Sequence, residues 1–264
     1  MAKTAHTSAF LLNLQEGTEA RPGRKKSDRT LARIRLATAH CLERSGYNSL
    51  KASAISLEAG LSEGSFYVYF EDKNQAAISV LSDFLQYGIG SPHERGRASN
   101  AFEAIRATNR VWIQTAVEHP GLTRSVLQLV DSDAEFAKIY TSHNKRWHEM
   151  VSGSVLRRYP SGYDNSDLSI MFAVVAMGAM MDEVVRGIFS TGTYAHLLHL
   201  VGHDKTGRQL ADALSVIWFR VLYPGAELPQ EKGRQPYLMS ELDGTLAELN
   251  FGSLTKASVA ARAK

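Results

Sequence analysis

Ala54-Ile-Ser-Leu-Glu-Ala-Gly-Leu-Ser-Glu-Gly-Ser-Phe-Tyr-Val-Tyr-Phe70 is the most informative segment of this 264-residue chain. It predicts one short helix that ends at Gly60 and another that begins after Ser62. Glycine tolerates the left-handed backbone at a helix end, and a serine hydroxyl accepts hydrogen bonds from the first free N–H groups of a helix. Two short helices joined in this way, with Leu61 as an apolar plug, form a helix-turn-helix, whose second helix typically enters the major groove of DNA.

The aromatic residues of the second helix separate an inner face from an outer face. Phe66 and Phe70 are four residues apart and therefore share the buried face. Tyr67 and Tyr69 cannot both join them, so at least one tyrosine faces outward. An outward tyrosine can hydrogen-bond to phosphate or lie against a base edge. This arrangement favours DNA binding over the alternative, a helical hairpin that serves only for packing.

Apolar periodicity predicts an all-α chain with no strands. The expected helices cover about 28–46, 50–59, 63–70, 72–87, 98–118, 121–131, 133–158, 165–190, 193–202 and 206–222. The predicted domains are a flexible basic arm over 1–27, a three-helix DNA-binding domain over 28–75, a larger effector-binding and dimerisation domain over 76–224, and an extension over 225–264 that can form one helix, 236–251.

The N-terminal segment resembles the DNA-binding domain of the tetracycline-repressor (TetR) family. The resemblance covers 29–73 and is carried by Gly46-Tyr47, Ala59-Gly60-Leu61-Ser62, Gly64-Ser65-Phe66-Tyr67-Val68-Tyr69-Phe70 and Lys73. It implies a dimeric regulator, released from DNA by a small molecule. It also implies DNA contacts from Lys51, Ser62, Glu63, Gly64, Ser65, Tyr67, Val68, Tyr69 and Lys73. Glu63 departs from the usual pattern, because a carboxylate repels phosphate but can accept a hydrogen bond from cytosine N4.

Charge supports a nucleic-acid partner for the N-terminal quarter. The whole chain has a net charge of +3, yet the residues from Arg21 to Lys73 include ten Lys or Arg and only six Asp or Glu. Such an asymmetry is typical of a DNA-binding module on a neutral body. The run Arg24-Lys25-Lys26 is interpreted as a solvated tail, with a minor-groove arm as the alternative.

The segment Leu168–Met181 is apolar nearly all round, so both of its faces must be covered. One face is expected to meet the chain's own core and the other a second copy, with 206–222 as the partner helix. The predicted dimer interface consists of Val174, Gly178, Met181, Leu210, Leu214, Ile217, Trp218 and Val221. The alternative is a fully buried monomer core. A twofold dimer would place its recognition helices roughly 34–36 Å apart, on a near-palindromic operator.

An effector pocket is predicted among the helices 72–87, 98–118, 133–158 and 165–190. Its candidate lining is Phe84, Trp112, Tyr140, His143, Trp147, Phe172, Met177 and Met180. This composition suggests a hydrophobic or amphipathic effector, such as an acyl chain, a sterol-like molecule or a drug. A plain core is the alternative. An effector-independent regulator and a regulator that binds DNA only with its ligand also remain open.

Other functions find little support in the sequence. The single cysteine, Cys41, excludes an internal disulfide, and no signal peptide or membrane span is expected, which predicts a cytoplasmic protein without a membrane partner. The histidines His196, His199 and His203 could share a helical face, but we expect no metal there. No phosphate-binding loop, nucleophile elbow or carboxylate pair indicates an enzyme or a cofactor.

Overall fold

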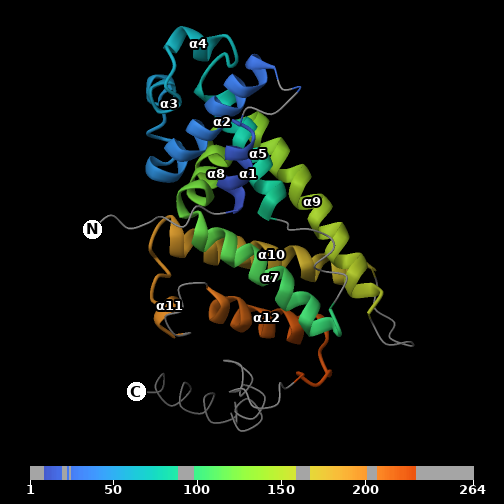
Figure 1. The fold of residues 1–264 in the computed structure, drawn as a ribbon. Helices are drawn as coiled ribbons and strands as arrows, with labels where there is room; N and C mark the ends of the chain where they lie inside the picture. Colours follow the sequence, from blue (N-terminus) through green and yellow to red (C-terminus); the bar gives the residue numbers. More distant parts are fainter. Residues whose placement is uncertain are drawn as a thin grey trace, which may run out of the picture.

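The computed structural model describes residues 9–19, 23, 25–88, 98–158, 167–200 and 207–229, and all regular secondary structure in these ranges is helical (Figure 1). The predicted all-α fold is therefore confirmed. The helices are α1 (Ala9–Glu16), α2 (Lys26–Ser45), α3 (Ala52–Ala59), α4 (Glu63–Tyr67), α5 (Lys73–Gly88), α7 (Ala101–Glu118), α8 (Pro120–Ser132), α9 (Ala134–Leu156), α10 (Asp167–Phe189), α11 (Leu197–Leu200) and α12 (Arg208–Leu222).

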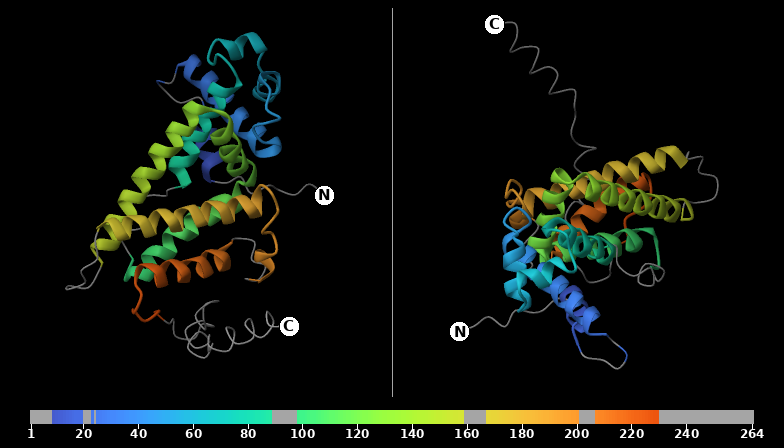
Figure 2. Two further views of the ribbon diagram at one scale, coloured as in Figure 1. Left: turned by 180° about the vertical axis from the view of Figure 1, so that it is seen from behind. Right: turned by 90° about the horizontal axis from the view of Figure 1, so that it is seen from above.

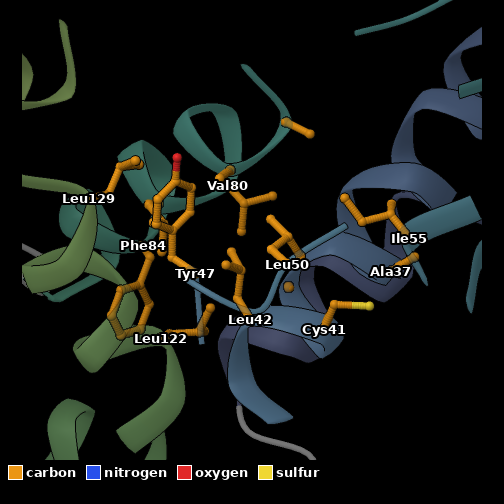
Figure 3. Close-up of a cluster of buried hydrophobic side chains, with 14 of the residues drawn as sticks. Ala37, Cys41, Leu42, Tyr47, Leu50, Ile55, Val80, Phe84, Leu122 and Leu129 are labelled. Carbon is orange, nitrogen blue, oxygen red and sulfur yellow. The ribbon is translucent and has the colours of Figure 1, made fainter. Parts of the chain in front are cut away.

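The helices α2, α3 and α4 form the N-terminal end of the molecule and share a core with α5 and α8 (Figure 1). Leu42 of α2 and Val80 of α5 are completely buried, and Leu122 of α8 packs in the same cluster (Figure 3). The apolar residues of α2 thus pack against three neighbours, α3, α5 and α8. Consequently, α2, α3 and α4 are continuous with the body of the protein.

The helices α7, α9, α10 and α12 form the larger domain around a second core (Figures 1 and 2). Phe102 and Phe219 pack edge to face with their ring centroids 5.5 Å apart, and Trp147 meets Trp218 in the same way at 5.9 Å. These aromatic contacts tie α7 and α9 to α12.

One carboxylate joins α7 to α12. Arg106, which is 3% exposed, donates from Nε to Asp212 at 3.0 Å. Arg110 donates from Nε and Nη2 to both oxygens of the same carboxylate at 2.7 Å. Because Arg106 is buried, loss of this partner leaves a desolvated charge that its second partner, Glu103, compensates only in part.

Asp212→Asn is therefore expected to lower the free energy of unfolding by about 3 kcal/mol. Urea denaturation followed by circular dichroism measures this change. Glu183→Gln is the matched control, because Glu183 is exposed and its carboxylate lies 3.7 Å from the exposed Arg186; it should cost less than about 1 kcal/mol. Equal losses in the two variants would show that the Asp212 pairs contribute no more than a surface ion pair.

The prediction of an unstructured arm over 1–27 is wrong for its central part. Residues Ala9–Glu16 form helix α1, and Phe10 is only 4% exposed. The ring of Phe10 lies 5.3 Å from Phe84, 5.4 Å from Tyr87 and 5.9 Å from His119. Burial of this aromatic side chain against α5 offsets the entropy of ordering the segment.

Several predicted boundaries also differ. Helix α4 ends at Tyr67 rather than at Phe70, and α11 begins at Leu197 rather than at 193. The N-cap of α2 is Lys25, without a side-chain cap, rather than Ser27 or Asp28. The predicted helix 236–251 and the histidine His203 lie outside the described residues.

Helix α10 is the one described helix long and apolar enough to cross a membrane, judged by length and composition alone. It packs along one side against α9 and α12, while Leu168, Phe172 and Val175 remain 81%, 75% and 42% exposed. The other side of α10 is therefore an uncovered apolar face in a single chain.

Candidate nucleic-acid interface

The turn between α3 and α4 has the geometry that the sequence predicts. Gly60 adopts a left-handed conformation with φ 63° and ψ 41°. Its N–H donates to the carbonyl of Leu57 at 3.0 Å, and the N–H of Leu61 donates to the carbonyl of Ser56 at 2.9 Å. A residue with a side chain would be strained here, so glycine allows α3 to stop and the chain to turn into α4.

Helix α4 is fixed from inside and capped at its beginning. The hydroxyl of Ser62 accepts a hydrogen bond from the backbone N–H of Ser65 at 3.2 Å. Phe66 is completely buried and Phe70 is 6% exposed, with their ring centroids 5.8 Å apart. Two buried phenylalanines therefore anchor this helix against the domain core, which confirms the predicted inner face.

The outer face of α4 carries the predicted outward aromatic residue. Tyr67 is 54% exposed and Val68 is 77% exposed, whereas Tyr69 is half-buried. The ring of Tyr67 stands edge to face on Phe66, at 5.3 Å and 85°. The buried ring therefore holds the exposed one, and the prediction that at least one tyrosine faces outward is confirmed.

The predicted DNA-contact residues all belong to this end of the molecule. Six of them are exposed: Lys51, Ser62, Glu63, Gly64, Tyr67 and Val68. The other three are half-buried: Ser65, Tyr69 and Lys73. The ammonium of Lys73 lies 5.0 Å above the ring of Tyr47, which positions it at the beginning of α5. Contact of any of these residues with DNA remains a prediction.

Gly64 has no structural need to be glycine. An added Cβ would meet only the hydroxyl of Ser62, at 3.9 Å, and the backbone there is not left-handed. Glycine inside a helix also costs roughly 0.5–1 kcal/mol relative to alanine. The role that the family resemblance implies for Gly64, close approach of DNA to the backbone, remains a prediction.

The contact between α2 and α8 was not predicted from the sequence. The carboxylate of Glu43 accepts hydrogen bonds from the backbone N–H groups of Gly121 and Leu122, both at 3.0 Å, in the first turn of α8. An added Cβ at Gly121 would lie 1.9 Å from the carbonyl oxygen of Glu43, so only glycine allows this approach. A carboxylate at a helix N-terminus is also favoured by the helix dipole.

A second contact between the same segments comes from a side chain of α8 that binds the loop after α2. The side-chain oxygen of Gln128 in α8 accepts hydrogen bonds from the backbone N–H groups of Tyr47 at 2.9 Å and Asn48 at 3.4 Å. The loop after α2 is thus held by α8. Motion of α8 would therefore be transmitted to the helix-turn-helix.

The ionisation of Glu43 should contribute to stability at neutral pH. Burial alone would raise the pKa of this carboxyl, but His119 and the amides of Gly121 and Leu122 favour its charged form and lower the pKa below 4.5. A carboxyl with a lowered folded-state pKa stabilises the protein above its unfolded pKa, and this stabilisation is lost as the pH falls through the lowered value.

Glu43→Gln is therefore expected to lower the free energy of unfolding at pH 7 by about 1.5–3 kcal/mol, the range for hydrogen bonds to charged groups. The gap to the wild type should narrow as the pH falls below 4.5. Denaturation series at pH 7 and near pH 3 measure both effects. Glu135→Gln, at an exposed position in α9, is the control. A gap that stays constant with pH would contradict an ionised role for Glu43.

A small pocket lies where the effector site is predicted, between α5, α7, α9 and α10. Its volume is about 50 Å³, and Trp112, His143 and Trp147 of the predicted lining reach it. Burial lowers the pKa of His143 and of the neighbouring His148, so both imidazoles are neutral near pH 7. The carboxylate of Asp182, also in the lining, accepts a hydrogen bond from Tyr140 at 2.8 Å. The pocket is thus more polar than predicted.

The remaining predicted pocket residues lie elsewhere. Phe84 belongs to the first core, while Met177 and Met180 are half-buried against the second. Phe172 was wrongly assigned to the pocket, because it is 75% exposed on the outer side of α10. The stretch Leu168–Met181 of α10 is apolar nearly all round, so its spacing could not show which side faces inward.

The predicted dimer residues are corrected for the same reason. Six of them are buried inside the single chain: Val174, Gly178, Met181, Leu210, Leu214 and Trp218. Ile217 is half-buried, and Val221 is 45% exposed. The apolar surface left for a partner is instead the face of Leu168, Phe172 and Val175 on α10, called the α10 face below.

The described residues hold no group of three or more histidine, cysteine, aspartate or glutamate side chains able to bind a metal. His196 and His199 are both exposed beside and within α11. Cys41 is buried in α2, and burial raises the pKa of its thiol, which makes it unreactive.

The geometry at the N-terminal end is that of a helix-turn-helix domain, and the comparison with known families agrees. Residues 34–77 match the family model described as bacterial regulatory proteins, tetR family. The N-terminal domain is therefore similar to that of the TetR family, and the described part of the chain has the fold of TetR-family transcriptional regulators. No curated protein matches the sequence.

Solved structures show the same fold at low sequence identity. The fatty acid degradation regulator FadR from Bacillus halodurans is 17% identical, with a TM-score of 0.56 over 78% of this chain and 97% of that one. A TetR-family regulator from Syntrophomonas wolfei is 14% identical, with a TM-score of 0.57 over 77% and 100%. FadR from Bacillus subtilis, in complex with stearoyl-CoA, is 18% identical, with a TM-score of 0.53 over 74% and 98%.

Proposed function

We propose that the protein is a transcriptional regulator that binds a near-palindromic DNA operator as a homodimer and responds to a small molecule. The observation that carries the proposal is the outer face of α4. Tyr67 and the C-cap residue Val68 are exposed there, while Phe66 within the helix and Phe70 just after it are buried beneath them. A duplex lying against this face would account for the large exposed aromatic side chain. It would also account for Gly64, because nothing within the chain requires glycine at that position.

The α10 face supports the dimer. Leu168, Phe172 and Val175 follow one another at helical steps of four and three residues, so they form one stripe. Exposed apolar stripes of this kind mark protein interfaces. A twofold axis beside α10 would bring two such stripes together, and the partly exposed Val221 of α12 would extend the contact.

The larger domain supports an effector. Pocket-lining residues lie on α5, which contacts α2, and on α7, which contacts α8. The stearoyl-CoA complex of the Bacillus subtilis relative shows that this fold can bind an acyl compound. We infer that a small molecule with an apolar part binds among α5, α7, α9, α10 and α12.

The proposed response is a shift between two conformations. Helix α7 lines the pocket and is followed directly by α8, which holds α2 through Glu43 and Gln128. Ligand that moves α7 would displace α8 and, with it, the helix-turn-helix. The spacing of the two recognition helices would then no longer match the operator, and DNA would be released.

The experiment that tests the function is selection of genomic fragments by the purified protein, followed by gel retardation of the selected fragments. Gly64→Ala should lower operator affinity at least tenfold while leaving thermal stability equal or higher, because alanine is the better helix residue. Gln86→Ala, at an exposed position in α5, is the control for an innocuous change. No retained fragment at low ionic strength, or full affinity of the Gly64→Ala protein, would contradict the proposal.

A further inference from the structure

We propose that a second cavity, between α7, α9 and α12, binds an amphipathic molecule with an aliphatic chain and an anionic group, and that Arg157 and Arg158 bind the anionic group. This inference deepens the effector role proposed above and rests on it for any effect on DNA, although binding itself can be measured separately. The cavity has a volume of about 400 Å³. Pockets for small ligands typically measure roughly 300–1,000 Å³.

The inner wall of this cavity is suited to an aliphatic chain. Ile105 of α7 and Val151 and Val155 of α9 contribute aliphatic surface, and Trp147 and Trp218 contribute aromatic surface. Burial of each CH₂ group of a ligand against such surface contributes about 0.8 kcal/mol. Ligand affinity should therefore increase with the length of the aliphatic chain, and the polar end of the ligand should lie at the mouth of the cavity.

The charged lining residues are both cationic. Arg157 and Arg158 follow the end of α9 and belong to the cavity lining, which contains no carboxylate among the described residues. Within the described ranges, neither arginine forms an ion pair with a carboxylate, in contrast to Arg106 and Arg110, which are bound to Asp212. Arg158 donates from Nη1 to the carbonyl and hydroxyl of Ser154, which fixes its guanidinium beside the opening.

Two adjacent guanidinium groups at the mouth of an apolar cavity favour a carboxylate or phosphate. Their position at a helix C-terminus is also favourable for α9 itself, but that role requires no cavity beside them. The combination of charge and cavity is what indicates a ligand.

An unsatisfied buried donor gives an independent indication. Trp218 lines the cavity and is only 2% exposed, and its indole Nε1 has no hydrogen-bond partner among the described residues. Buried polar groups nearly always have partners. The atom has no solvent-accessible surface in the single chain, so a carbonyl or carboxylate oxygen of a ligand would accept this hydrogen bond once the side chains that cover Nε1 shift. An acyl group joined to an anion provides such an oxygen, whereas a plain hydrocarbon does not.

The smaller pocket shows why the anion belongs at the arginine end. The two cavities share Thr108, Asn109 and Trp147, so they are neighbours. The smaller one contains the buried carboxylate of Asp182, which would repel an anion. The ligand is therefore oriented with its charge at Arg157 and Arg158 and its chain between α7 and α12. Its contact with α7 is also a contact with the helix that leads into α8.

Isothermal titration calorimetry on the full-length protein tests this inference with four probes that share one chain length. These are dodecanoate, dodecanoyl-CoA, dodecanol and dodecyltrimethylammonium, each used below its micellar concentration. At least one anionic probe should bind ten times more tightly than dodecanol, and the cationic probe should bind most weakly. Preference for dodecanoate identifies a carboxylate as the anion, and preference for the thioester identifies the phosphates. Equal binding of the anionic and neutral probes would overturn the inference.

Variants locate the site. The double variant Arg157→Gln/Arg158→Gln should abolish the tenfold preference for the anion. Trp218→Phe keeps an aromatic ring and removes the N–H donor. It should lower the affinity for the preferred probe about threefold to tenfold, as expected for one hydrogen bond. Arg208→Gln, at an exposed position at the start of α12, is the control. It should change neither the preference for the anion nor the affinity for the preferred probe. A double variant that keeps the preference would place the anion elsewhere and overturn the inference.

The outcomes for ligand and for DNA are separable. If the protein retards its operator but shows no anion preference, this inference fails and the proposed regulator stands. If it binds the anionic probe but retards no DNA, the proposed function fails and the ligand site stands.

Discussion

Phe172→Glu is expected to convert the dimer into monomers and to reduce operator affinity more than a hundredfold. Phe172 is 75% exposed at the middle of the α10 face, between Leu168 and Val175. In a twofold dimer the substitution occurs twice near the axis, so two carboxylates would face each other in an apolar contact. Burial of an unpaired charge costs several kcal/mol, which a dimer of ordinary affinity does not withstand. A monomer that binds one half-site loses the affinity contributed by the second.

Light scattering measures the mass in solution, which should fall from two chains to one chain of 29.1 kDa. Circular dichroism should remain that of the wild type, because the residue is outside both cores. Leu200→Glu, at a position 67% exposed in α11, is the control and should remain dimeric. A Phe172→Glu protein that is still a dimer with full operator affinity would move the interface away from α10.

Tyr67→Ala is expected to lower operator affinity by about tenfold to a hundredfold, the loss that corresponds to about 1–3 kcal/mol for one specific contact. Tyr67 is 54% exposed, so the free energy of unfolding should change by less than about 1 kcal/mol. Gel retardation over a range of salt concentrations distinguishes a contact without charge from a charged contact with phosphate. The loss should be the same at all salt concentrations, because no charge is removed.

Lys73→Gln is the matched comparison for the tyrosine. Loss of one phosphate contact should weaken binding to all sequences and reduce the salt slope by about one. Tyr67→Phe then isolates the hydroxyl, and full affinity of this variant would assign the contribution to the ring. Unchanged affinity of Tyr67→Ala would show that the outer face of α4 is not the surface that reads DNA.

The helix-turn-helix could be predicted from sequence because its determinants are local. Gly60 at the turn, Ser62 at the cap and the spacing of Phe66 and Phe70 act within a few residues of one another. Each has one strongly preferred conformation or environment, so their combination predicts both the turn and the buried face. The structure differs in beginning α3 at Ala52 rather than at 50 and in ending α4 at Tyr67.

The faces of α10 could not be predicted in the same way. Amphipathic spacing shows an inner face only where polar residues mark the outer one, and Leu168–Met181 has a single polar residue, Ser169, near its beginning. The packing of α9 and α12 decides that Val174 and Met181 are inside and Phe172 outside. Information about which helices pack together is distributed over the whole chain and is absent from the helix itself.

Long-range contacts account for the other omissions. Glu43 and Gly121 are far apart in sequence, and neither residue type signals a junction on its own. Helix α1 did have a local signal, because Phe10 and Leu14 are four residues apart. That signal was outweighed by the nearby glycines and proline, and only the docking of Phe10 against Phe84 shows its importance.

Footprinting of a selected operator, combined with the mass of the protein–DNA complex, examines dimerisation and groove recognition together. Two chains per duplex are predicted, with two protected half-sites whose centres are separated by roughly 34–36 Å, one turn of the duplex. A complex with one chain and a single protected site would contradict the dimer. Failure to retard any promoter fragment at low ionic strength, including the region upstream of its own gene, would contradict DNA binding itself.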